Sequence, residues 1–113
     1  MMVKSQRDGG RTMLFLVLDP AEPPDLDSVS VQDAVAAMRR SLEWVRAEQQ
    51  AGRIVAHYAL KGQHRAMTIF DVADRPALDA LLAEWPNLRP NPEVYPLVGL
   101  DELEAFLARA ADD

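Results

Sequence analysis

A run of six consecutive apolar residues, MLFLVL at positions 13–18, constrains the fold of this chain more than any other feature. The run is too short for a buried helix, is rich in branched and aromatic residues, and ends at Asp19-Pro20. It therefore predicts a β-strand that is buried on both faces. Such a strand needs a covering layer on each side, and other parts of the chain or a second subunit must supply those layers.

Apolar residues recur at spacings of three and four after residue 30, which predicts a helix from Val31 to about Ala51 that stops at Gly52. One stripe of this helix is expected to face a sheet, and it consists of Val31, Val35, Met38, Leu42 and Val45. Trp44 falls opposite that stripe on a helical wheel, so we expect it outside the chain's own core. It is then either a shielded surface aromatic or a contact with another subunit.

Residues 53–62 and 63–72 read as two strands of a hairpin that turns near Lys61-Gly62-Gln63. That turn places His57 opposite a residue near position 67. The sequence Asp74-Arg75-Pro76 predicts the start of a second helix, which ends at a proline. The apolar stripe of this helix is Leu78, Leu81, Leu82 and Trp85.

Residues 93–99 predict a last short strand, and Pro96 within it favours an edge position. A final amphipathic helix follows, with Leu100, Leu103, Phe106 and Leu107 on one side. The order β-α-β-β-α-β plus a helix predicts an α+β, ferredoxin-like fold: a four-stranded antiparallel sheet with two helices on one face. Since the strands are apolar on both faces, we expect a homodimer or higher homo-oligomer that pairs the sheets into a dimeric α/β barrel around a pocket.

Composition limits the remaining possibilities. At 113 residues the chain has the size of one domain, which we place at residues 13–113 after a disordered lead-in of residues 1–12. The net charge of −6 argues against binding to nucleic acid or to an anionic membrane. The chain has no cysteine, and the sequence shows neither an apolar leader nor a run of about 20 apolar residues, so we expect a cytoplasmic protein without disulfides or a membrane span.

The two histidines, His57 and His64, fall on separate strands of the hairpin without a metal-ligand spacing, so no metal site is predicted. If His57 points inward, its neutral imidazole suits proton transfer near pH 7; the alternative is a structural histidine. Tyr58 and Tyr95 either donate a hydrogen bond to a substrate carbonyl or pack with the hydroxyl at the rim. For Asp71 we favour a role in capping the second helix over a catalytic one.

Five short segments resemble the muconolactone isomerase family, over residues 13–98. The matching segments are Met13-Leu14-Phe15, Gly52, Gly62, Ile69-Phe70-Asp71-Val72 and Glu93-Val94-Tyr95-Pro96-Leu97. The resemblance implies a small dimeric α/β barrel enzyme of aromatic-acid catabolism that moves a proton next to a lactone carbonyl and needs no cofactor. The last helix extends beyond the family's short tail, so it could cap a neighbouring subunit.

The resemblance also suggests where the site lies. We name His57, Tyr58 and Arg40 as catalytic candidates, and the substrate-binding candidates are Leu16, Leu18, His64, Phe70 and Trp85. The family carries polar, basic side chains at the positions of Leu16 and Leu18, and an acidic residue at the position of Ser41. These departures favour a less charged substrate.

Two kinds of function follow. The first is an enzyme that isomerises a hydrophobic cyclic lactone, enone or polyketide-like molecule by proton transfer, or one that cyclises or oxygenates an aromatic polyketide without a cofactor. The second is a catalytically silent small-molecule-binding barrel. The enzyme requires a pocket with His57 or Tyr58 near Arg40, whereas the binding protein requires a pocket lined by apolar side chains alone.

Overall fold

The computed structural model describes residues 12–21 and 29–112, and these form one four-stranded antiparallel sheet with three helices. The strand order is β2-β3-β1-β4. The predicted ferredoxin-like α+β fold and its final helix are confirmed, whereas residues 1–11 of the expected lead-in lie outside the described residues. The elements are β1 (Met13–Leu18), α1 (Val31–Gln50), β2 (Ile54–Ala59), β3 (Ala66–Val72), α2 (Arg75–Glu84), β4 (Glu93–Leu97) and α3 (Leu100–Asp112).

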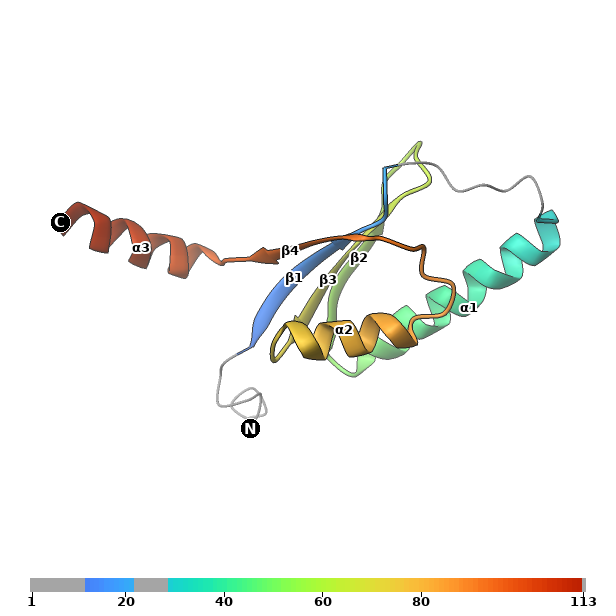
Figure 1. Cartoon of the computed structure of the whole chain (residues 1–113), viewed down its shortest axis with the longest axis horizontal. Helices are drawn as coiled ribbons and strands as arrows, with labels where there is room; N and C mark the ends of the chain where they lie inside the picture. Colours follow the sequence, from blue (N-terminus) through green and yellow to red (C-terminus); the bar gives the residue numbers. More distant parts are fainter. Residues whose placement is uncertain (1–11, 22–28, 113) are drawn as a thin grey trace.

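Helices α1 and α2 lie on the same side of the sheet (Figure 1). Alternate strand residues point to this side, as the two-residue period of a strand requires. They join side chains of both helices in one core: Phe15, Val17, Val45, Ile54, Phe70, Val72, Leu78 and Trp85. The core is therefore a single layer between the sheet and the two helices.

The opposite side of the sheet, here called the open face, carries the remaining strand residues. Leu16 of β1 is paired with Ile69 of β3 and with Tyr95 of β4, so all three side chains lie on this face. Among the described residues no helix covers it (Figure 1). The predicted mismatch, a sheet that is apolar on both faces with helices on only one, is confirmed.

The face that α1 turns to the sheet differs from our expectation. Of the predicted stripe only Val45 is buried, at 4% exposure, while Val31 is 79% exposed and three more members are exposed as well: Val35, Met38 and Leu42. The N-terminal half of α1 extends past the end of the sheet (Figure 1), so Val31, Val35 and Met38 have no core to enter. The expectation that the whole stripe packs on the sheet is wrong.

The residues of α1 that do meet the core are centred about a quarter turn from that stripe, at positions 41, 44 and 48 together with the stripe member Val45. Trp44 is half-buried against the core, so the expectation that it lies outside the core is wrong. Glu48 is buried, and its carboxylate accepts hydrogen bonds from Nε and Nη2 of Arg53. A face that contains a serine and a glutamate does not stand out as apolar in the sequence.

The hairpin is shifted by one residue from the predicted register. The amide of Leu60 donates to the carbonyl of Arg65 over 2.8 Å, so the loop spans residues 61–64. His57 therefore pairs with Thr68. A register shift between Ile54 and Ala56 leaves Val55 as an extra, exposed residue in β2, which is a β-bulge.

Helix α2 begins as predicted. The carboxylate of Asp74 accepts a hydrogen bond from the Ala77 amide over 2.9 Å, and Pro76 lies in the first turn. Asp74 is the N-cap, so the expected capping role of Asp71 is wrong. Strand β4 is an edge strand, as Pro96 indicated.

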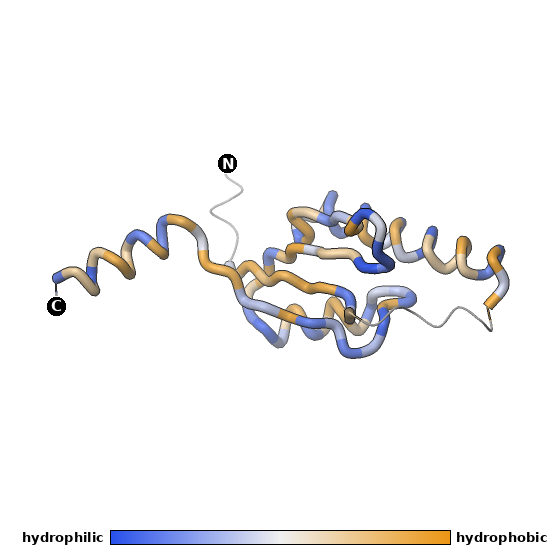
Figure 2. Tube along the Cα trace, turned by 90° about the horizontal axis from the view of Figure 1, so that it is seen from above, coloured by the Kyte–Doolittle hydropathy of each residue, from blue (hydrophilic) through white to orange (hydrophobic). Residues whose placement is uncertain are grey.

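Helix α3 projects away from the sheet at the end of β4 (Figure 1). All its residues up to Asp112 are exposed, and apolar and polar residues alternate along it (Figure 2). Within the described part of the chain, no helix has the length and apolar character to cross a membrane.

Candidate functional site

Strands β2 and β3 bring a histidine and a threonine together on the face that the helices cover. Nδ1 of His57 lies 2.8 Å from Oγ1 of Thr68. Thr68 is 1% exposed and His57 is half-buried. Because a buried hydroxyl needs a partner, this hydrogen bond fixes the orientation of the imidazole ring.

Three large aromatic side chains, here called the aromatic cluster, pack together beside this pair: Trp44 of α1, Phe70 of β3 and Trp85 at the end of α2. The two indoles are stacked with centroids 5.1 Å apart, and Phe70 meets Trp85 edge-on at 6.0 Å. The imidazole of His57 lies edge-on to Trp85 at 6.2 Å. Aromatic pairs prefer these stacked and edge-to-face arrangements, so the cluster is a well-packed wall beside the histidine.

A second polar contact links the two helices at this cluster. Nε1 of Trp85 donates a hydrogen bond to Oγ of Ser41 over 2.7 Å. Trp85 is the C-cap residue of α2, and Pro86 prevents the helix from continuing. The indole is thus held between the end of α2 and the middle of α1.

Burial lowers the pKa of His57 below its ordinary value of 6.5, while the negative charge of Asp19 acts weakly in the opposite direction. Desolvation disfavours the charged imidazolium, so the neutral form predominates at pH 7. A neutral imidazole with one nitrogen already bonded has its other nitrogen left for a substrate. In the part of the chain that the structure describes, no three acidic or histidine side chains gather as a metal site.

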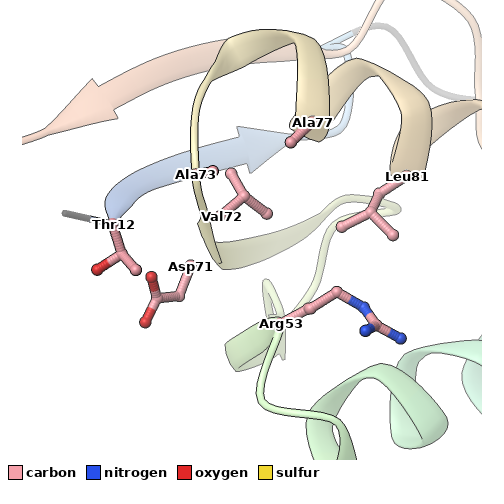
Figure 3. A pocket seen from close by; sticks show the side chains of 7 residues that line it. All are labelled: Thr12, Arg53, Asp71, Val72, Ala73, Ala77 and Leu81. Atoms are coloured by element: carbon pink, nitrogen blue, oxygen red, sulfur yellow. The ribbon is translucent and has the colours of Figure 1, made fainter. Parts of the chain in front are cut away.

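A pocket of about 280 Å³ lies elsewhere, below α2 (Figure 3). Neither His57 nor the aromatic cluster lines this pocket. Figure 3 shows the carboxylate of Asp71 beside Thr12 and the guanidinium of Arg53 on the side of α1. The lining residues are Thr12, Arg53, Asp71, Val72, Ala73, Ala77 and Leu81.

Comparison with known proteins identifies the family. The model of the family described as muconolactone delta-isomerase matches residues 13–98, which is most of the chain and includes every strand, α1 and α2. This chain belongs to the muconolactone delta-isomerase family. The family is one of isomerase-like enzymes that act on small molecules. Helix α3 lies beyond the matched residues.

Two other comparisons add little to this family assignment. The search of curated proteins returns no match. Among solved structures, the chain is similar to the uncharacterized protein TM1266 from Thermotoga maritima, with 13% identity and a TM-score of 0.41 over 78% of this chain and 98% of that one. A similarity this low supports no statement about function.

Of the residues proposed from the sequence of this muconolactone delta-isomerase family member, the structure brings three together: His57, Phe70 and Trp85. Tyr58 pairs with Met67, so it lies on the open face, where it is 64% exposed. Arg40 is exposed on α1. The structure thus separates the three catalytic candidates.

The other substrate-binding candidates also lie away from the cluster. Leu16 and Leu18 are half-buried on the open face. His64 is exposed in the hairpin loop, and its carbonyl oxygen accepts a hydrogen bond from Nη1 of Arg89 over 2.9 Å. Tyr95 is on the open face too, and its hydroxyl donates to Glu93 over 2.6 Å, which raises the pKa of Tyr95.

Sequence reasoning did not select three residues of this site: Ser41, Trp44 and Thr68. Thr68 has a recognisable signal, because it is the one hydroxyl residue in the apolar strand AMTIFDV. Trp44 and Ser41 lie three positions apart, which puts them on the same side of a helix. The more apolar neighbouring stripe was expected to be the buried face of the helix, so this side was not considered.

Proposed function

We propose that this protein is an enzyme that moves a proton within a small, hydrophobic cyclic substrate, such as a lactone, an enone or a polyketide-like ring. The observation that carries the proposal is the His57 imidazole, which is half-buried, neutral at pH 7 and held by Thr68 against the aromatic cluster. A base of this kind suits proton transfer near neutral pH. Membership in an isomerase-like family supports the same reaction class.

The reaction assigns a different role to each nitrogen of His57. The reaction uses the tautomer in which Nδ1–H donates to Oγ1 of Thr68, because Nε2 then holds the lone pair. Nε2 removes a proton from the carbon next to the substrate carbonyl, and the electron pair moves to the carbonyl oxygen as an enolate. In a substrate with a ring double bond beside that carbon, the enolate is conjugated with the double bond. The imidazolium then returns the proton to the far carbon of the double bond, so the product is an isomer of the substrate.

The developing enolate needs a hydrogen-bond donor, and Ser41 is our candidate. Its oxygen accepts from Nε1 of Trp85, which leaves its own O–H free to donate to a substrate oxygen. Phe70 and Trp85 are buried, so a planar ring would meet the half-buried side chains of His57 and Trp44 at the border of the aromatic cluster, which excludes water there. Exclusion of water strengthens the hydrogen bonds made to the enolate.

A binding protein without turnover is the second candidate. It is favoured by the apolar character of the cluster and by the leucines at positions 16 and 18, where the family carries polar residues. Such a protein would bind the same ring but leave its protons in place. Cofactor-independent cyclisation or oxygenation of an aromatic ring would use the same apolar wall.

The deciding experiment measures proton exchange. The protein is incubated in D₂O with a panel of butenolides and cyclic enones, and NMR follows deuterium incorporation next to the carbonyl. We expect exchange by the wild type and by His64→Asn, a matched control at the exposed histidine, and loss of exchange in His57→Asn. Exchange at the full rate by folded His57→Asn would overturn the assignment. Binding without exchange or other turnover would favour the silent protein.

We also propose that the open face pairs with the open face of a second copy. Large apolar residues lie on this face in the two central strands, among them Leu16 and Ile69. Burying this surface removes apolar area from water, which stabilises association. The resulting homodimer is the α/β barrel expected from the sequence.

A further inference from the structure

Two apolar stripes in this chain have no described partner. The first, here called the α1 stripe, comprises Val31, Val35, Met38 and Leu42, which are all exposed. The second, the α3 stripe, comprises Leu100, Leu103, Phe106 and Leu107, which are also exposed. Eight large apolar side chains in two contiguous rows are more than scattered surface residues, and patches of this kind mark interaction sites.

The α3 stripe cannot cover the α1 stripe within one molecule. They lie near opposite ends of the chain's long axis, which is 59 Å (Figure 1). Only Val98 and Gly99 separate β4 from α3, and two residues span at most about 7 Å. Helix α3 has 13 residues and is therefore about 20 Å long. Folded back, α3 would reach at most the Leu42 end of its own α1 stripe and would leave most of that stripe uncovered.

The borders of the two stripes carry opposite charges. Arg39 and Arg46 follow stripe residues Val35 and Leu42 by four positions, so they border the α1 stripe. Glu102 and Glu104 border the α3 stripe in the same way, with a single cation, Arg109, beside Phe106, so the net charge of this border is negative. No ion pair joins Arg39 or Arg46 to another described residue. The borders thus offer the charge complementarity that orients an interface.

We propose that the α3 stripe of one copy packs on the α1 stripe of a second copy, and that two copies exchange their α3 helices in this way. The α1 stripe spans about 17 Å and the α3 stripe about 11 Å of helix, so the shorter row fits within the longer one. Because a two-fold dimer forms the contact twice, the exchange buries both sets of stripes. The contact differs from pairing of the open faces and does not depend on catalysis.

Cross-linking tests the exchange directly, because the chain has no cysteine of its own. Met38→Cys is mixed with a mass-tagged Leu103→Cys variant, a short bis-maleimide is added, and intact mass spectrometry identifies the products. We expect the heterologous product to predominate. Arg40→Cys, on the opposite side of the same helix, is the matched control and should give little product with Leu103→Cys.

Three results would overturn the proposal. A product only between two Met38→Cys chains would mean that α1 stripes pair with each other. A stronger product of Leu103→Cys with Leu16→Cys would place α3 on the open face. A heterologous yield no higher than that of the Arg40→Cys control would mean that something other than α3 covers the α1 stripe. Leu103→Asp/Phe106→Asp, which alters exposed residues alone, should abolish the heterologous contact in a cysteine-bearing background.

Discussion

His57 and Thr68 face each other across β2 and β3, with Nδ1 and Oγ1 2.8 Å apart under the covering helices. The threonine is the more deeply buried of the two, so the hydroxyl is fixed and the imidazole adapts to it. Thr68 is therefore a positioning residue, and His57 is the residue that meets the substrate in the proposed reaction.

Thr68→Val should slow proton transfer without unfolding the protein. Valine keeps the shape of threonine but removes the hydrogen bond, which costs the folded state about 1 kcal/mol. The imidazole then loses its fixed tautomer, so we expect kcat to fall more than KM rises, and Thr68→Ser should restore much of the rate. Unchanged kcat in Thr68→Val would show that the hydroxyl has no part in positioning His57.

The pH dependence of activity should follow His57. Its pKa lies below 6.5, so kcat/KM should stay constant from pH 8 down to about pH 6.5 and fall at lower pH, as the base becomes protonated. His64→Asn should keep this acidic limb. An acidic limb with a midpoint above pH 6.5 would contradict a desolvated His57 as the base.

Stability should show the same titration. The unfolded state binds a proton at His57 more readily than the folded state, because the folded pKa is the lower one. The contribution of His57 to the free energy of unfolding is thus complete above pH 6.5 and decreases as the pH falls below that value. Between pH 7.5 and 5.5, urea unfolding should show a smaller loss in the free energy of unfolding for His57→Asn than for the wild type. An equal loss in the two proteins would show that His57 does not contribute to the pH dependence of stability.

The hydrogen bond from Trp85 to Ser41 should appear as a coupling energy. In a double-mutant cycle with Ser41→Ala and Trp85→Phe, we expect a coupling of about 1 kcal/mol in the free energy of unfolding. The matched cycle of Ser41→Ala with Trp44→Phe, which share no hydrogen bond, should give a smaller value. Equal couplings in the two cycles would mean that packing alone joins α1 to Trp85.

Leu16→Asp should weaken association through the open face. A carboxylate in the centre of a sheet-to-sheet contact is desolvated without a partner, so dimers formed there should dissociate. Sedimentation velocity measures the mass, and circular dichroism checks that the variant is folded. Ala80→Asp, at an exposed position of α2, is the control. A dimer that survives Leu16→Asp unchanged would place the interface elsewhere.

The order of helices and strands could be predicted because local signals specify it. The six-residue apolar run, the Asp74 cap and Pro96 on an edge strand each act through residues that are close in sequence. The face of α1 that enters the core could not be predicted in this way. Its polar residues, Ser41 and Glu48, are satisfied by Trp85 and Arg53, which come from other parts of the chain.

The site was predicted in part for a related reason. His57 was selected because a strand histidine suits proton transfer, and the aromatic residues at positions 70 and 85 followed from the family resemblance. Thr68 was not selected, because the predicted turn was one residue too short and placed His57 opposite position 67. Hydrophobic periodicity also does not distinguish a stripe that enters the core from one that stays exposed, as the α1 stripe does.

The extra residue at Val55 decides on which side of the sheet His57 lies. In a regular strand, odd and even positions take opposite sides, so Ile54 and His57 would point in opposite directions. The bulge reverses this parity, and both now point toward the helices. Because the bulge absorbs Val55, deleting its single codon would leave a regular strand in which His57 still pairs with Thr68 and stays under the helices, whereas straightening β2 with Val55 in place would turn the imidazole to the other side of the sheet.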